Sequence, residues 1–80
     1  MPNKIAIIGI IVENLDSVEK LNILLHNYSK FIIGRLGLPY KERAVNIISI
    51  AVDAPERIIH NLTEKIGAID GISSNTAVSK

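Results

Sequence analysis

One stretch near the start of this chain limits its possible folds more than any other feature. Lys4 to Glu13 is an almost unbroken run of isoleucine, valine and alanine. β-Branched side chains favour strands, and an apolar run without alternation is typical of a strand that is covered on both faces. The run therefore predicts a strand with two apolar faces. They are Ile5, Ile7, Gly9 and Ile11 on one side, and Ala6, Ile8, Ile10 and Val12 on the other.

A second segment repeats this pattern. Arg43 to Val52 also predicts a strand, with Val45, Ile47, Ser49 and Ala51 on one face and Asn46, Ile48, Ile50 and Val52 on the other. Lys30 to Leu38 predicts a further strand, and only the polar connection Pro39–Glu42 separates the two. Strands joined by so short a loop pair antiparallel.

Helical signals follow the first and third strands. Asp16 and Glu19 have the spacing of a capping box, which predicts a helix that ends near Tyr28 or Ser29. Asp53 and Glu56 repeat that spacing before a second helix. The predicted buried positions are Val18, Leu21, Leu24, Leu25 and Tyr28 in the first helix, and Ile58, Ile59, Leu62 and Ile66 in the second, which Gly67 ends.

The last segment, Ile72 to Val78, is a more polar strand and therefore suits a sheet edge. The order strand, helix, strand, strand, helix, strand predicts an α+β fold, the ferredoxin-like βαββαβ sandwich. Its four-stranded antiparallel sheet has the order 4-1-3-2, with two helices on one face. We expect residues 1–80 to form a single domain of this kind.

Two helices can cover only one face of such a sheet, although both central strands are apolar on both faces. Leaving about ten large apolar side chains in water would forfeit on the order of 15–30 kcal/mol. That exceeds the roughly 5–15 kcal/mol by which folded domains are stable. Since 48% of the residues are apolar, we expect a homodimer or homotetramer in which copies of the chain cover this face.

Composition excludes several classes of function. The chain has no cysteine, so disulfides, thiolate metal sites and cysteine nucleophiles are excluded. The formal charge is +1 with no basic run, and direct nucleic-acid binding is therefore not expected. The apolar run is followed by Glu13 and Asp16 and is too short for a membrane span, so a cytoplasmic protein is expected.

The candidate binding segment runs from Ile33 to Tyr40. Gly34 and Gly37 lie inside a predicted strand, where glycine often marks a bulge or a close approach by a ligand. Strict alternation places Arg35 beside Phe31 and Ile33 on an apolar face, where a guanidinium needs an anionic partner. Arg35 therefore anchors a small anionic effector, forms a salt bridge between subunits, or is a partly exposed arginine at the edge of the sheet.

The histidines and the possibility of catalysis leave two alternatives. His26 and His60 lie on separate predicted helices, so one chain forms no metal site, but several subunits could combine them in a metal-responsive module. No catalytic motif is present, so no catalytic residue is assigned and an enzyme is not expected. The alternative is a small dimeric ferredoxin-like enzyme with a perturbed carboxylate or histidine in a deep pocket. The residues specify no cofactor.

Three segments together resemble one family. They are Leu24–Ser29, Gly34–Tyr40 with its Gly-Arg-x-Gly-x-Pro pattern, and Ile50–Asp53. The chain resembles the small regulators associated with the iron-only hydrogenase system. The resemblance implies a fold similar to ACT domains and to the carboxy-terminal domain of the nickel-responsive repressor, and a regulatory role through an effector or protein partner. The candidate binding residues are Gly34, Arg35, Gly37, His26 and Tyr40; the alternative for the last two is a surface or helix-cap histidine and a packing tyrosine.

Overall fold

Six main elements follow one another as strand, helix, strand, strand, helix and strand. The structure is a computed structural model and describes residues 2–80. The elements are β1 (Asn3–Val12), α1 (Val18–Asn27), β2 (Ile32–Tyr40), β3 (Val45–Pro55), α2 (Glu56–Gly67) and β4 (Ile72–Val78). Single 3-10 turns stand before α1, β2 and β3. No helix formed by residues 2–80 has the length and apolarity that crossing a membrane requires.

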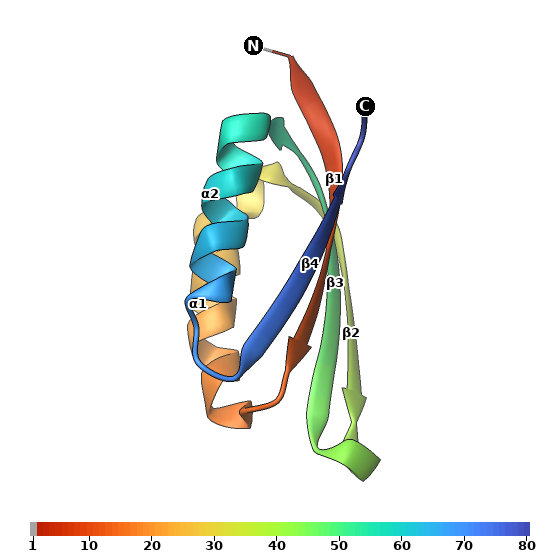
Figure 1. The fold of residues 1–80 in the computed structure, drawn as a ribbon, viewed down its shortest axis with the longest axis vertical. Helices are drawn as coiled ribbons and strands as arrows, with labels where there is room; N and C mark the ends of the chain where they lie inside the picture. Colours follow the sequence, from red (N-terminus) through yellow and green to blue (C-terminus); the bar gives the residue numbers. More distant parts are fainter. Residues whose placement is uncertain (1) are drawn as a thin grey trace.

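The sheet has the strand order β2-β3-β1-β4, and every neighbouring pair is antiparallel. Both helices lie against one of its faces, and within residues 2–80 no layer lies over the other face (Figure 1). The predicted order 4-1-3-2, with the apolar strands β1 and β3 in the middle, is confirmed. The arrangement is the ferredoxin-like fold.

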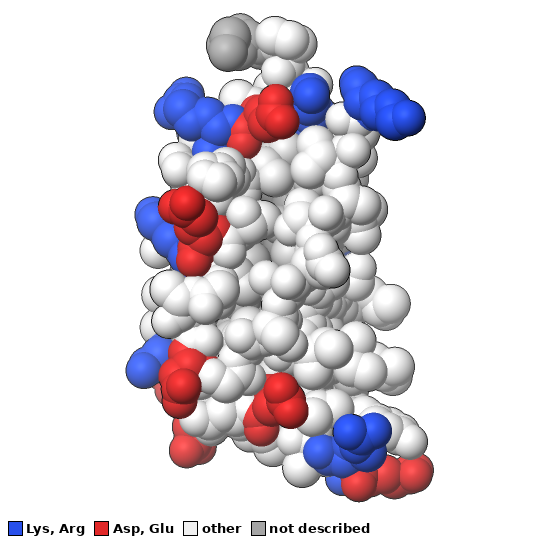
Figure 2. All heavy atoms as spheres, in the orientation of Figure 1, with Lys and Arg blue, Asp and Glu red and all other residues white. Residues whose placement is uncertain are grey.

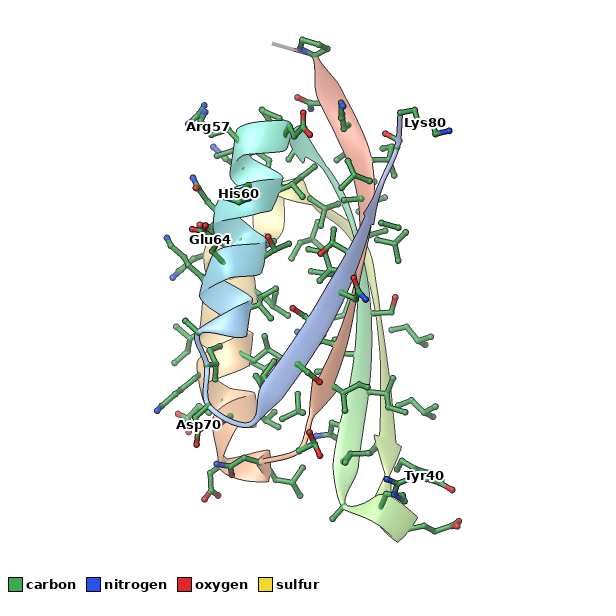
Figure 3. The ribbon with its side chains drawn as sticks, in the orientation of Figure 1. Tyr40, Arg57, His60, Glu64, Asp70 and Lys80 are labelled. Carbon is green, nitrogen blue, oxygen red and sulfur yellow. The ribbon has the colours of Figure 1, made fainter. Side chains whose placement is uncertain are left out.

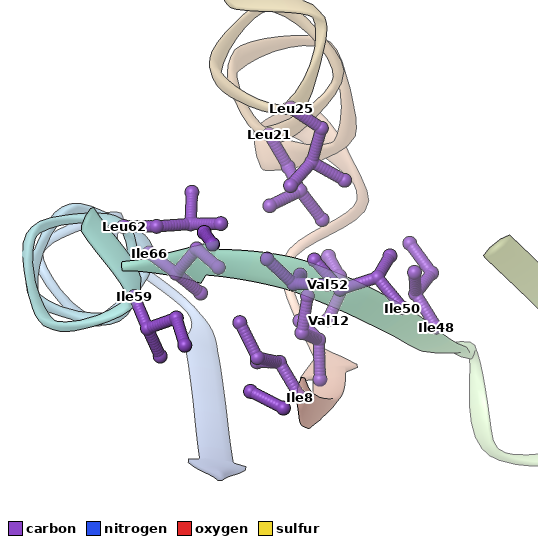
Figure 4. Close-up of a cluster of buried hydrophobic side chains, with 13 residues drawn as sticks. Ile8, Val12, Leu21, Leu25, Ile48, Ile50, Val52, Ile59, Leu62 and Ile66 are labelled. Atoms are coloured by element: carbon purple, nitrogen blue, oxygen red, sulfur yellow. The ribbon is translucent and has the colours of Figure 1, made fainter. Parts of the chain in front are cut away.

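The core lies between the sheet and the helices (Figure 4). In β1 and β3 every second side chain points into it, as the period of two in a strand requires. These core residues are Ala6, Ile8, Ile10 and Val12 of β1, Ile48, Ile50, Val52 and Ala54 of β3, and Leu21, Leu25, Ile59, Leu62 and Ile66 of the helices. All are less than 5% exposed, so this layer alone supplies a packed interior.

Both predicted helix caps are wrong. Before α1 a 3-10 turn spans Leu15–Ser17, and the capping oxygen is Oδ1 of Asn14, which accepts from the Asp16 N–H at 3.1 Å. Before α2 the pairing with β1 continues to the end of β3, where Pro55 lies opposite Asn3. Asp53 therefore lies inside a strand and caps nothing, and α2 begins directly after Pro55.

The hairpin of β2 and β3 is displaced from its predicted bounds. A 3-10 turn at Ser29–Phe31 delays the start of β2, and the ladder to β3 continues past Pro39 to Tyr40. The connection is the 3-10 turn Lys41–Arg43 followed by Ala44, whose φ of 52° is left-handed. The strand pairing, rather than the proline, sets the end of β2.

The turn before β4 depends on glycine. Gly71 has a φ of 75°, and a Cβ at this position would overlap the side chain of Asn14. The carbonyl of Gly71 accepts from the N–H of Glu13 at 2.8 Å, which continues the pairing of β1 with β4. β4 then spans Ile72–Val78 at the edge of the sheet, as predicted.

Candidate functional site

The uncovered sheet face carries many exposed apolar side chains, and we call it the open face. Its members are Ile5, Ile7, Gly9 and Ile11 of β1, Val45, Ile47, Ser49 and Ala51 of β3, Leu36, Leu38 and Tyr40 of β2, and Ser73, Asn75 and Ala77 of β4. Leu36 is 68% exposed, and Ile7 and Ile11 are 48% and 45% exposed. Monomeric proteins rarely leave so large a contiguous apolar surface in water.

Charged side chains gather away from the open face. Figure 2 shows them over the helices and at the two ends of the molecule, while the side of the sheet opposite the helices is largely free of them. The molecule measures 42 × 18 × 18 Å, so the open face extends along its greatest dimension. This distribution suits contact with another apolar surface.

Two hollows adjoin each other on the open face. One of about 450 Å³ lies beside Gly9 and Asn75, where the missing side chain of Gly9 lowers the surface. The other, of about 350 Å³, is lined by Glu13, Tyr40 and Arg43. They share Ile11, Ile47 and Ser73, so together they form one uneven, mainly apolar depression.

Arg35 does not share a face with Ile33, so the placement that strict alternation predicted is wrong. Ile32 pairs with Val52, whereas Gly34 pairs with the next residue, Ala51, so Ile33 is an extra residue in a β-bulge. The bulge reverses the alternation, and Arg35 pairs with the core residue Ile50 on the helix side of the sheet. There its Nη2 donates to Oδ1 of Asn22 in α1 at 2.7 Å. The guanidinium is exposed and its partner is a neutral amide, not an anion.

A separate hollow lies on the helix side of the sheet, where α1 meets β2. Its volume is about 340 Å³, and its lining is Asn22, Leu25, His26, Ser29, Ile32 and Arg35. The lining contains no carboxylate and offers a guanidinium, an imidazole, an amide and a hydroxyl. Such donors suit a small anion, because an arginine fork binds carboxylates and phosphates through paired hydrogen bonds. We call this hollow the Arg35 hollow.

The predicted site residues are thus divided. Arg35 and His26, nine residues apart in sequence and on different elements, line the same hollow. Gly34 lies in the bulge, as glycine in a strand suggests, and a Cβ at Gly34 or Gly37 would meet nothing within 4 Å. Tyr40 lies apart at the end of β2 on the open face, where its hydroxyl is 3.4 Å from Glu42 Oε2.

His60 belongs to a different surface. Its Nε2 lies 3.0 Å from Oε1 of Glu64, and both side chains are exposed on α2 (Figure 3). Across residues 2–80 no three histidine or acidic side chains come together as a metal site would require. Sequence reasoning missed Asn22 and Ser29 as neighbours of Arg35, since neither belongs to a motif and only the packing of α1 on β2 brings them there.

Comparisons with known proteins agree with this architecture. Residues 4–76 match the model of the TM1266-like family, described provisionally as iron-only hydrogenase system regulators. No curated protein gives a significant match. The structure of uncharacterized protein TM1266 from Thermotoga maritima is similar, with a TM-score of 0.93, 30% identity, and coverage of 98% of this chain and 99% of that one.

A more distant likeness concerns a nitrogen regulatory PII-like protein. CPII from Thiomonas intermedia K12, solved with ADP, AMP and bicarbonate, has a TM-score of 0.52 and 20% identity, and both chains are covered in full. At this identity the likeness concerns the fold.

Proposed function

We propose that this chain, which belongs to the TM1266-like family of iron-only hydrogenase system regulators, is a homo-oligomeric regulatory module of the cytoplasm. In this proposal residues 1–80 act as one domain. The open face joins copies of the chain, and the Arg35 hollow receives a small anionic effector. The module acts by binding and carries out no reaction.

The open face is the observation that carries this proposal. Seven of its large side chains, Ile5, Ile7, Ile11, Leu36, Leu38, Tyr40 and Ile47, keep 40–68% of their surface exposed, although the alternate residues of β1 and β3 are buried. Burying the exposed remainder of each would contribute on the order of half of the 1.5–3 kcal/mol that full burial of such a side chain provides. A second copy offers an equally apolar surface, and a closed symmetric pair buries the same patch on both partners.

The Arg35 hollow supports the effector part of the proposal. It lies on the opposite side of the sheet from the open face, so it stays accessible when copies associate through that face. Its donors converge from α1 and β2, and the Arg35–Asn22 hydrogen bond at 2.7 Å already holds the guanidinium at the rim. A carboxylate or phosphate could replace the water around this group without displacing a buried partner.

The test is analytical ultracentrifugation of the full chain and of Ile47→Lys at micromolar concentration. Lysine in the middle of the open face would bring an unpaired charge into the interface, so we expect a species smaller than the wild-type assembly. Ile23→Lys is the matched control, because Ile23 is 59% exposed but lies on α1. A folded wild-type monomer, or equal masses for all three proteins, would disprove the proposal.

A further inference from the structure

The two edges of the sheet differ in how they are protected. Exposed strand edges invite pairing with other chains, and proteins block them with bulges, prolines and charges. β2 has all three, in the bulge at Ile33, the guanidinium of Arg35 and the ring of Pro39. β4 has none of them, because Ile72–Val78 is uncharged, contains no proline and keeps an unbroken register with β1.

The hydrogen-bonding groups of β4 alternate in direction. Ser79 N–H donates to the Ile5 carbonyl at 2.8 Å, and Glu13 N–H donates to the Gly71 carbonyl at 2.8 Å. Odd-numbered residues of β4 therefore direct their backbone groups toward β1. In an antiparallel ladder the residues between them direct theirs the other way. Ile72, Ser74, Thr76 and Val78 thus face the free edge.

One exposed side chain hydrogen-bonds to the backbone at the free edge of β4. Within β4 itself, Asn75 Oδ1 accepts from the Thr76 N–H at 3.1 Å. This side chain is exposed and can rotate away, so it does not close the edge permanently. The space beside the edge is open, since a hollow of about 550 Å³ separates the outer side of α2 from Thr76 and Val78.

We propose that β4 pairs antiparallel with β4 of a second copy of this chain, with Asn75 opposite its own equivalent. This register pairs the whole of Ile72–Val78 with its equivalent. It also places each residue whose backbone groups face the free edge opposite another such residue. On the helix side it joins Ile72 with Val78 and Ser74 with Thr76. Apolar side chains thus meet apolar ones and hydroxyls meet hydroxyls, as favourable cross-strand pairs require.

The positions of the helices are compatible with the two-fold symmetry of this pairing. A two-fold axis at Asn75 places the α2 helices of the two copies antiparallel, so the end with Arg57 in one approaches the end with Glu64 in the other. Each end carries one acid and one base, Glu56 with Arg57 and Glu64 with Lys65, and no like charges accumulate. Figure 2 views this side and shows no charged side chain over the middle of β4. The result is a continuous sheet with all helices on one face.

A single introduced cysteine tests the register, because the chain has none of its own. In the proposed pair, position 75 is a non-hydrogen-bonded pair with Cα atoms about 4.5 Å apart, which is within disulfide range. Asn75→Cys should form a disulfide-linked dimer almost completely under mild oxidation at micromolar concentration. Ala77→Cys is the matched control, because its equivalent in the second copy lies about four residues away along the strand and should stay unlinked.

Proline substitutions separate the edge from the rest of the fold. Ser74→Pro removes an outward N–H, so it should abolish crosslinking through Asn75→Cys and leave the chain folded. Ser73→Pro removes an N–H directed toward β1 and should lower the melting temperature instead. Combining Asn75→Cys with Ile47→Lys should leave crosslinking intact, since the edge pairing does not depend on the open face.

The outcomes distinguish this proposal from the proposed function. Absence of a dimer from Asn75→Cys, equal crosslinking of Ala77→Cys, or crosslinking that survives Ser74→Pro would each overturn the edge pairing. If crosslinking through Asn75→Cys were lost when Ile47→Lys is also present, the contact would belong to the open face, and the edge pairing would again be overturned. A crosslinked Asn75→Cys dimer in that background, with an unchanged sedimentation profile for Ile47→Lys, would overturn only the open-face assembly.

Discussion

Ile7 and Ile8 are neighbours in β1 with the same side chain, yet Ile8 is fully buried and Ile7 keeps 48% of its surface exposed. The same contrast separates Ile47 from Ile48 in β3. One face of the sheet meets the helices and forms the core, and no other element of residues 2–80 covers the opposite face. Two apolar faces of one sheet therefore differ in role: one supplies the tertiary packing, and the other is the surface through which we propose that copies associate.

The largest expected effect contrasts these two neighbours directly. Ile8→Ala should lower the free energy of unfolding by about 2–5 kcal/mol, because it leaves a cavity in the packed layer. Ile7→Ala should cost about 1 kcal/mol or less in the dilute chain, since its side chain is already half in water. Urea unfolding at nanomolar to micromolar concentration measures both. Equal losses at the highest dilution would show that the open face is needed for folding itself.

A smaller effect is expected at Gly9, which lies on the open face between Ile7 and Ile11. A Cβ here would approach only the Asn75 carbonyl oxygen, at 4.0 Å, so the isolated sheet can accept it. Gly9→Ala should raise the stability of the dilute chain by about 0.5–1 kcal/mol, because it restricts the unfolded state. It should also weaken association by filling the hollow beside it. Thermal unfolding and sedimentation together test this, and an unchanged assembly would place the contact between copies elsewhere on the face.

The smallest effect on stability is expected at Arg35. Arg35→Ala removes an exposed hydrogen bond to a neutral amide, which is worth about 1 kcal/mol at most. The assembly should stay intact, because Arg35 lies on the helix side, but any small anion that copurifies should be lost. Native mass spectrometry measures both, with Arg57→Ala as the control for removing an exposed arginine elsewhere. A smaller assembly in Arg35→Ala would assign this residue to a subunit contact instead.

Much of the fold could be predicted because its signals are local. The apolar runs of β1 and β3 predicted their central position, and the polar Ile72–Val78 predicted an edge, all as observed. The caps failed because capping-box spacing is short and ambiguous. Asn14 competes with Asp16 for the same turn, and pairing with Asn3 keeps the end of β3 extended through Asp53. Such competition is decided by contacts distant in sequence.

The candidate site shows the same division. The glycines around Arg35 correctly suggested an irregular strand, but no local pattern reveals that Asn22 and His26 lie beside this residue. The reason is that Arg35 meets them only through the packing of α1 on β2. The difference between the two edges was equally hidden, because the bulge that protects β2 appears only in its pairing register with β3.

The sequence by itself determined the two apolar faces, the order of the elements and the surplus of hydrophobic surface, because each follows from residue type and periodicity. Only the tertiary structure decided on which face Arg35 lies. Ile32 must pack on the core, while the turn at Lys41–Ala44 sets the register of the other end of β2. The registers that these two constraints impose on β2 differ by one residue. Ile33 is therefore accommodated as a β-bulge, and every side chain after it lies on the face opposite to the one that strict alternation predicts.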